Sequence, residues 1–200
     1  MNIAVFASGN GTNLQALIDA EAGGGLSPGK IVLVVSDKAG AFALERAKKA
    51  GIETRVIEAN GMPREEYDKK VMSEIKDKNV DLIVLAGFMR ILSSNFVKQY
   101  NERILNIHPA LLPAFKGTHG IKDAFEAGVE VTGVTVHFVN EELDAGPIIL
   151  QEEVPIEKGD TLETLEEKIH AVEHRLYPKA VKLFAEGKLK IEGEKVRIRS

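Results

Sequence analysis

Asn106 and His108 are the residues of this sequence whose types and spacing suggest chemistry most directly. They lie in residues 104–113 (ILNIHPALLP), where a β-like run stops at Pro109 and a second proline follows at Pro113. Residues two apart on a strand face the same side, so an amide and an imidazole would point at one place. Such a pair can stabilise a developing oxyanion, and a neutral histidine can also accept a proton. A buried pair with purely structural hydrogen bonds is the alternative.

Asp144 is a candidate partner for that histidine. It lies in the turn NEELDAGPI, residues 140–148, where an aspartate before Ala-Gly-Pro can also serve only to form the turn. If the turn folds back over the end of the strand, the carboxylate would lie beside His108. It would then raise the pKa of the imidazole and stabilise its charged form.

A glycine-rich loop follows the first apolar run of the chain. In SGNGTNLQ, residues 8–15, Gly9 and Gly11 permit a tight turn, and a helix is expected to start at Thr12 or Asn13. Loop amides and a helix N-terminus together bind phosphate well. The loop therefore predicts a phosphate site, with a simple packing turn as the alternative.

Two other nucleotide-binding patterns match this loop less well. The dinucleotide fingerprint needs a third glycine where Leu14 stands, although Asp37 ends the second apolar run, where a ribose-binding acid would lie. That alternative is weakened but stays open. The P-loop pattern fails because no Gly-Lys-Ser/Thr follows the glycines.

A short match to a zinc motif occurs late in the chain. HAVEH, residues 170–174, places His170 and His174 four apart on an expected helix, as in some zinc proteases. A third ligand would have to come from elsewhere. An exposed or partly packed helix face is the commoner explanation, and we expect no metal.

Composition narrows the class of protein. The 200 residues include no cysteine, which excludes disulfides and thiolate chemistry, and the formal net charge is −4. Without clustered positive charge we expect no nucleic-acid partner. No apolar run is long enough for a membrane span, and the N-terminus lacks the features of a signal peptide. We expect a cytoplasmic protein that acts on small molecules, as a monomer or a homodimer.

The candidate residues must be positioned by a sheet and its helices. Apolar runs typical of strands alternate with helical patterns through the first hundred residues, which favours a doubly wound α/β fold: a mostly parallel sheet with helices on both faces. A period-two run at residues 129–139, followed after a turn that contains residues 144–147 by a second strand-like run, predicts an antiparallel pair added at the sheet edge in the C-terminal half. Strands are expected at 2–7, 30–37, 53–59, 80–88, 102–108, 129–139 and 146–156, and helices at 12–22, 39–51, 63–79 and 161–187, the last straight or kinked near Pro178. Residues 1–200 are expected to form one domain.

Five motifs together resemble one enzyme family over essentially the whole chain. SGNGTNLQ, LAGFMRIL, LNIHPALLP, HFVNEELDAGPIILQ and EHRLYP occur in the order and spacing of the phosphoribosylglycinamide formyltransferases. The resemblance implies the formyltransferase fold and transfer of a formyl group from 10-formyltetrahydrofolate to glycinamide ribonucleotide in purine synthesis. Direct attack by the substrate amine needs no covalent enzyme intermediate.

The resemblance also implies roles for individual residues. The N-terminal half would bind the ribonucleotide phosphate, and the C-terminal half would bind folate and carry out catalysis. A cis peptide is expected at Leu112–Pro113. The catalytic trio would be Asn106, His108 and Asp144; ribonucleotide would be bound by Gly11, Thr12, Asn13, His170 and Glu173; and folate would be bound by Arg64, Met89, Arg90, Ile91, Leu92, Asn106, Asn140, Glu141, Glu142, Leu143 and Asp144.

Some positions depart from the family pattern. Thr12 stands where serine is common, which keeps the hydroxyl, and His170 stands where some members have glutamine. Residues 114–120 (AFKGTHG) also differ from the familiar bacterial version. These departures concern the details of substrate contacts.

Three rival functions deserve comparison. Methionyl-tRNA formyltransferases share the formyl-transfer core but carry a further C-terminal domain, whereas this chain ends soon after its long helix. Formyltetrahydrofolate deformylases add an N-terminal regulatory domain, whereas the first strand here begins at Asn2. A non-enzymatic nucleotide-binding module would explain the glycine loop but not Asn106, His108 and Asp144 together.

Overall fold

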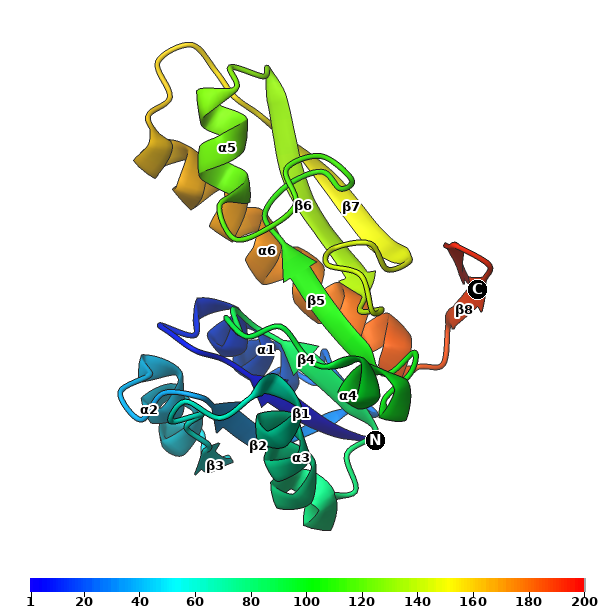
Figure 1. Cartoon of the computed structure of the whole chain (residues 1–200). Coiled ribbons are helices and arrows are strands. Elements are labelled where there is room, and N and C mark those ends of the chain that lie inside the picture. Colours follow the sequence, from blue (N-terminus) through cyan, green and yellow to red (C-terminus); the bar gives the residue numbers. More distant parts are fainter. Residues whose placement is uncertain (200) are drawn as a thin grey trace.

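A nine-stranded sheet forms the centre of the protein (Figure 1). The computed structural model describes residues 1–199. The sheet order is β3-β2-β1-β4-β5-β6-β7-β9-β8; β1 to β5 are parallel, and β6 runs antiparallel to both β5 and β7. The strands are β1 (Asn2–Phe6), β2 (Lys30–Ser36), β3 (Glu53–Val56), β4 (Leu82–Leu85), β5 (Ile104–His108), β6 (Val131–Phe138), β7 (Ile148–Pro155), β8 (Leu189–Glu192) and β9 (Lys195–Ile198).

Helices cover both faces of this sheet. They are α1 (Thr12–Ala22), α2 (Phe42–Lys49), α3 (Arg64–Ile75) with the 3-10 turn η1 (Lys76–Lys78), α4 (Ser94–Gln99), α5 (Gly120–Glu126) and α6 (Leu162–Ala185). One apolar cluster joins α1, α2 and α6 to the sheet, and a second joins α3 and α4 to the opposite face. Successive side chains of β1 point to opposite faces of the sheet, so Ile3 and Val5 enter the first cluster and Ala4 and Phe6 enter the second. The predicted fold class is confirmed.

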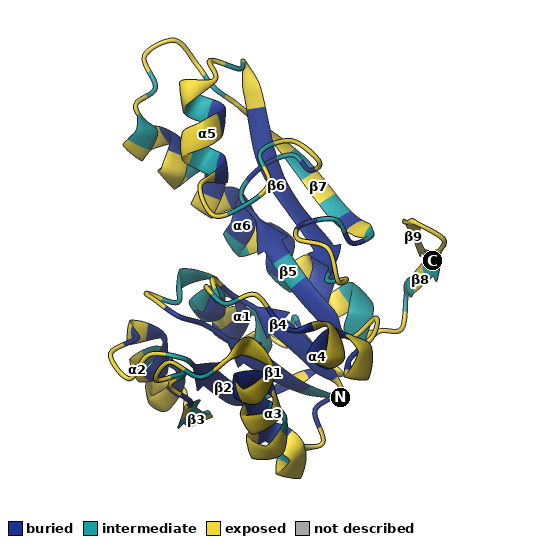
Figure 2. Ribbon diagram, viewed as in Figure 1, coloured by how far each residue is buried: buried dark blue, intermediate teal, exposed yellow. Residues whose placement is uncertain are grey.

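The central strands are buried on both faces, which fits the continuous apolar runs that predicted them (Figure 2). All four residues of β4 are buried. The outer helix faces and the C-terminal hairpin are exposed (Figure 2). The core therefore lies where β1, β4, β5 and β6 meet the helices.

The long helix α6 is anchored at its start and in its middle. Thr161 and Thr164 form a reciprocal capping box at its N-terminus. Farther along, the buried Tyr177 hydroxyl lies 2.8 Å from the Leu85 carbonyl oxygen and 3.0 Å from that of Leu105. The helix continues through Pro178 as one element. Tyr177 thus ties α6 to β4 and β5.

Four details differ from the expectations. Helices α4 and α5 were not predicted, because six and seven residues give too little periodicity to recognise. The β8–β9 hairpin was not predicted either, and it rather than the β6–β7 pair forms the sheet edge. The segment that joins β6 to β7 is longer than the expected turn. Pro63 is the N-cap residue of α3 rather than part of its first turn.

Within residues 1–199, no helix combines the length and apolar character needed to cross a bilayer.

Candidate active site

Asn106 and His108 face the same side of β5, as their spacing predicts. Leu105 and Ile107 point the other way, into the apolar cluster beneath α6. Asn106 is partly buried and His108 is 3% exposed. The pair lies at the carboxyl end of a parallel strand, where this class of fold places its ligands.

The structure brings Asp144 beside His108. The Asp144 Oδ2 atom lies 3.6 Å from His108 Nδ1 and accepts a hydrogen bond of 2.8 Å from the Gly117 amide. The other ring nitrogen of His108, Nε2, donates to the Phe115 carbonyl over 2.7 Å. Asp144 is 9% exposed and has a positive φ of 50°. The turn therefore folds back over the strand end, as the sequence interpretation required.

His137 is a fourth polar residue of this site, which was not predicted from the sequence. It stands opposite Asn106 in the β5–β6 pairing, and its Nε2 lies 3.2 Å from Asn106 Nδ2 and 3.8 Å from Asp144 Oδ1. Its Nδ1 must donate to the Phe138 carbonyl at 2.8 Å, so Nε2 is the atom that accepts from Asn106. Burial lowers the pKa of His137 and keeps the ring neutral.

The proline-containing segment after His108 is fixed by side chains of β6 and β7. Thr135 Oγ1 donates to the Ala110 carbonyl at 2.7 Å and accepts from the Leu112 amide at 3.1 Å. Gln151 Nε2 donates to the Leu112 carbonyl at 3.0 Å. The Leu112–Pro113 peptide is cis, as predicted. These contacts hold residues 109–113 in place next to the histidine.

The glycine loop leads into α1 as predicted. Gly11 is the N-cap residue with φ +76°, a conformation that favours glycine, and a Cβ there would lie 2.7 Å from the Ala43 side chain. No side chain caps α1, and its first turn carries no acid. The first-turn amides are therefore free to bind an anion.

Asn13 connects this helix to α6. Its Nδ2 donates to Glu173 Oε2 at 3.1 Å, and His170 Nδ1 lies 2.9 Å from the same oxygen. The hydrogen bond to Glu173 raises the pKa of His170, whereas burial lowers that of His174. Asn13 Oδ1 is buried without a partner among the described residues. The expected ribonucleotide residues thus lie together, with one polar atom left for a ligand.

One cavity of about 500 Å³ joins both groups of residues. Arg64, an exposed residue at the start of α3, is the one expected folate contact that does not line it. The apolar rim of this cavity includes the half-exposed side chains of Met89, Ile91 and Leu143, which suit a flat apolar ligand. The cavity is lined by all other expected site residues: Gly11, Thr12, Asn13, Met89, Arg90, Ile91, Leu92, Asn106, His108, Asn140, Glu141, Glu142, Leu143, Asp144, His170 and Glu173.

The part of the chain that the structure describes shows no cluster of three or more His, Cys, Asp or Glu side chains that could hold a metal ion. In the zinc-like motif, His170 is bonded to Glu173 and its ring stacks on that of His174, with centroids 6.3 Å apart.

Comparison with known proteins places the chain in a family. The model of the formyl transferase family matches residues 1–181, so the chain belongs to that family. The Escherichia coli phosphoribosylglycinamide formyltransferase is 48% identical over 96% of this chain and 90% of its own length. The crystal structure of glycinamide ribonucleotide transformylase 1 from Symbiobacterium toebii is 47% identical, with a TM-score of 0.96 over 100% of this chain and 94% of that one.

Within the formyl transferases, the chain belongs to the family of the phosphoribosylglycinamide formyltransferases. A longer relative is the chicken trifunctional purine biosynthetic protein adenosine-3, which is 52% identical over 96% of this chain. The chain spans 19% of the length of that protein.

Proposed function

We propose that this protein transfers the formyl group of 10-formyltetrahydrofolate to the amine of glycinamide ribonucleotide in de novo purine synthesis. The observation that carries the proposal is the single cavity that joins an anion-binding helix N-terminus to a buried Asn–His–Asp group. A phosphate held at one end places the rest of the substrate toward the acid–base group at the other. The names of the relatives support the same reaction.

Asn106 and His108 would stabilise the tetrahedral intermediate. The amine attacks the formyl carbon, and the carbonyl oxygen becomes an oxyanion that needs donors. Asn106 uses one N–H on His137 and has a second N–H to offer. His108 offers its Nε2–H, which here bonds to the Phe115 carbonyl, so the formyl oxygen would take the place of that carbonyl.

Asp144 and His108 would manage the protons. The attacking amine must lose a proton, and the folate nitrogen that leaves must gain one. The Asp144 carboxylate lies 3.6 Å from the imidazole, close enough to orient the ring and to interact with the charge that develops during proton transfer. The proton can then pass from the new ammonium through this pair to the leaving nitrogen.

Binding would draw on both halves of the chain. The α1 N-terminus would hold the phosphate, and Glu173 would bind the ribose hydroxyls with His170 nearby. Residues 89–92 and 140–144 would enclose the pterin ring, and Arg64 would meet the glutamate tail. The two substrates meet at the carboxyl ends of β4 and β5, so catalysis needs both halves to pack as one unit.

The test follows the absorbance change of a 10-formyl folate analogue with and without glycinamide ribonucleotide. Turnover is expected only when the ribonucleotide is present, and glycinamide that lacks the phosphoribosyl group serves as a control for phosphate recognition. Equal turnover without the ribonucleotide would identify a deformylase instead.

A further inference from the structure

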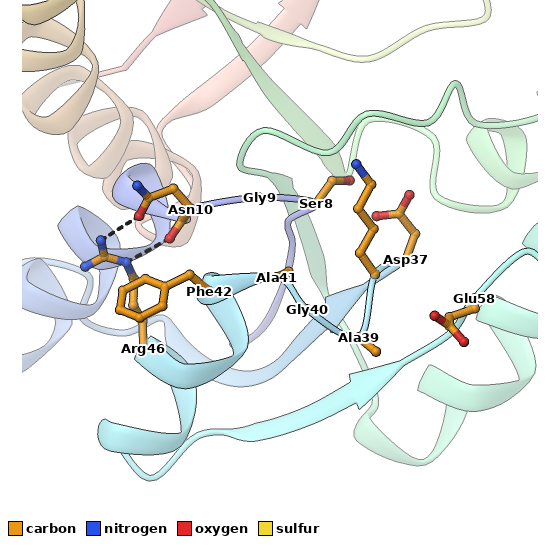
Figure 3. Close-up of a pocket in the computed structure, with 11 residues that line it drawn as sticks. Ser8, Gly9, Asn10, Asp37, Ala39, Gly40, Ala41, Phe42, Arg46 and Glu58 are labelled. Atoms are coloured by element: carbon orange, nitrogen blue, oxygen red, sulfur yellow. Dashed lines mark hydrogen bonds between the residues drawn. The ribbon is translucent and has the colours of Figure 1, made fainter.

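A second cavity lies beside the glycine loop and plays no part in the proposed reaction. It measures about 740 Å³ and opens where β1, β2 and β3 end (Figure 3). It shares Gly9 and Asn10 with the catalytic cavity, so the same loop separates the two. Its lining consists of Ser8, Gly9, Asn10, Asp37, Lys38, Ala39, Gly40, Ala41, Phe42, Arg46 and Glu58.

Asp37 gives this cavity an acceptor that no described residue uses. Its Oδ1 atom is buried and has no hydrogen-bond partner within residues 1–199. A buried carboxylate oxygen without a donor is costly, so a rotation of the Asp37 side chain that lets a ligand in the cavity supply a donor would be favoured. Asp37 follows β2, the strand next to β1, and in sheets of order 3-2-1-4 the acid at this place binds a ribose hydroxyl.

The rest of the lining limits the kind of ligand. Phe42 is 49% exposed and lies at one end of the cavity, with the Arg46 guanidinium carbon 4.9 Å from its ring centroid (Figure 3). Arg46 is engaged with the backbone and side-chain oxygens of Asn10. Lys38 and Glu58 are exposed charges of opposite sign. The cavity therefore suits a ligand with hydroxyl donors and a flat ring better than one that is anionic throughout.

The glycine-loop end offers backbone sites for a negative group. The first-turn amides of α1 are uncapped, and a Cβ added at Gly9 would meet no atom within 4 Å. Gly9 and Asn10, which line both cavities, directly precede this helix end, so a phosphate bound from the second cavity would lie at the loop that the two cavities share.

We propose that this cavity binds a nucleoside 5′-monophosphate, with its ribose hydroxyls on Asp37, its base against Phe42 and its phosphate at the N-terminus of α1. The inference rests on the proposed function in one respect: the same amides would hold the phosphate of the ribonucleotide substrate. The nucleotide therefore competes with the ribonucleotide and not with the folate. Asp37 and Phe42 contribute to nucleotide binding and not to turnover.

The test uses adenosine monophosphate as the probe and compares wild type, Asp37→Asn and Phe42→Ala. The nucleotide is expected to inhibit wild type competitively against the ribonucleotide. Loss of a hydrogen bond to a charged acceptor should raise the inhibition constant about tenfold in Asp37→Asn. The KM for the ribonucleotide should stay within about twofold of wild type, because Asp37 lies outside the catalytic cavity. Asp123→Asn, an exposed acid on α5, is the matched control.

2′-Deoxyadenosine monophosphate distinguishes recognition of the ribose hydroxyls from binding through the phosphate charge alone. It should bind wild type about tenfold more weakly than adenosine monophosphate, and the two nucleotides should bind Asp37→Asn equally well. Inorganic phosphate should inhibit wild type and Asp37→Asn equally.

Three outcomes would overturn the inference. Adenosine monophosphate could fail to inhibit, or it could inhibit Asp37→Asn as strongly as wild type, which would place it in the ribonucleotide site itself. Competition with the folate alone would also contradict it. Failure of the proposed function looks different, since no variant would then show ribonucleotide-dependent turnover, and calorimetric binding of the same nucleotides would still decide the inference.

Discussion

At the scale of single residues, the catalytic proposal depends on His108 and Asp144. His108→Ala removes an oxyanion donor, and Asp144→Asn removes the carboxylate that faces His108 Nδ1. Each is expected to lower kcat by about 10² to 10³. Because neither residue lies in α1 or α6, the helices proposed to bind the ribonucleotide, calorimetric binding of the ribonucleotide should change little. Equal losses of binding and turnover would contradict these roles.

His137 is expected to act through Asn106. Its neutral Nε2 accepts one amide N–H of Asn106 and so fixes which way the other N–H points. His137→Leu removes the acceptor and should lower kcat about tenfold, with little change in KM for either substrate. His137→Gln retains an acceptor and should recover part of the loss. If both variants lose activity in proportion to a fall in Tm, His137 is only a structural residue.

His170 predicts a pH dependence of ribonucleotide binding. Its hydrogen bond to Glu173 raises its pKa, so the charged form persists to higher pH than in a free histidine and is lost as the pH rises through the raised value. The charge favours a nearby phosphate, with a modest effect because the side chain is half exposed.

The measurement compares the dissociation constant of the ribonucleotide for His170→Gln and wild type from pH 5.5 to 8.5. This ratio cancels the titration of the phosphate itself. The dissociation constant for His170→Gln divided by that for wild type should be about 3 at the acid end and fall toward 1 at the alkaline end. A ratio that rises with pH would reverse the assigned sign.

At the scale of elements, Arg46 of α2 fixes the glycine loop (Figure 3). Its Nε and Nη2 donate to the Asn10 carbonyl and Oδ1 at 2.8 Å each, and Nη1 donates to Gln15 Oε1 at 3.2 Å. Arg46→Ala should loosen the loop and raise the KM for ribonucleotide about fivefold, with kcat and the KM for folate unchanged.

Lys48→Ala on the same helix is the matched control for that variant, because Lys48 is exposed and pairs, within residues 1–199, only with Glu45. An equal rise in KM in both variants would show that the charge of α2 matters rather than the contact with Asn10.

The elements also show how far the sequence could predict this molecule. The strands β1, β2 and β4 were predictable because each contains a continuous apolar run, and β5 was predictable as a β-like run despite Asn106 and His108. Helices α4 and α5 were not, since neither completes two turns. The β8–β9 hairpin was missed because its residues are exposed or only partly buried and it packs at the margin.

The candidate site was predictable where spacing alone places side chains. Asn106 and His108 share a face by period two, but the approach of Asp144 needed the path of a nine-residue segment. His137 was missed although Thr135 and His137 alternate with apolar residues on β6. The β5–β6 register sets His137 opposite Asn106, and it is this register that brings the polar face of β6 next to the polar face of β5.

At the scale of the whole molecule, Tyr177 holds α6 against the central strands. Tyr177→Phe leaves the Leu85 and Leu105 carbonyls without this donor and should lower the free energy of unfolding by about 1 to 3 kcal/mol. Tyr67→Phe is a close control, since Tyr67 is equally buried but its hydroxyl has no partner within residues 1–199. Denaturant unfolding measures both, and an equal loss in the two variants would contradict the role of the Tyr177 hydrogen bonds.

The placement of the two chain ends has a consequence for how this molecule can be connected to others. The first residue lies at the amino end of β1, and the C-terminal hairpin pairs at the outer edge of the sheet near the start of β7 (Figure 1). Both cavities open at the carboxyl ends of the strands. A tether, a second enzyme or a solid support joined at Met1 would therefore extend from the amino ends of the strands, away from both cavities. Substrates would still reach the catalytic mouth from free solution.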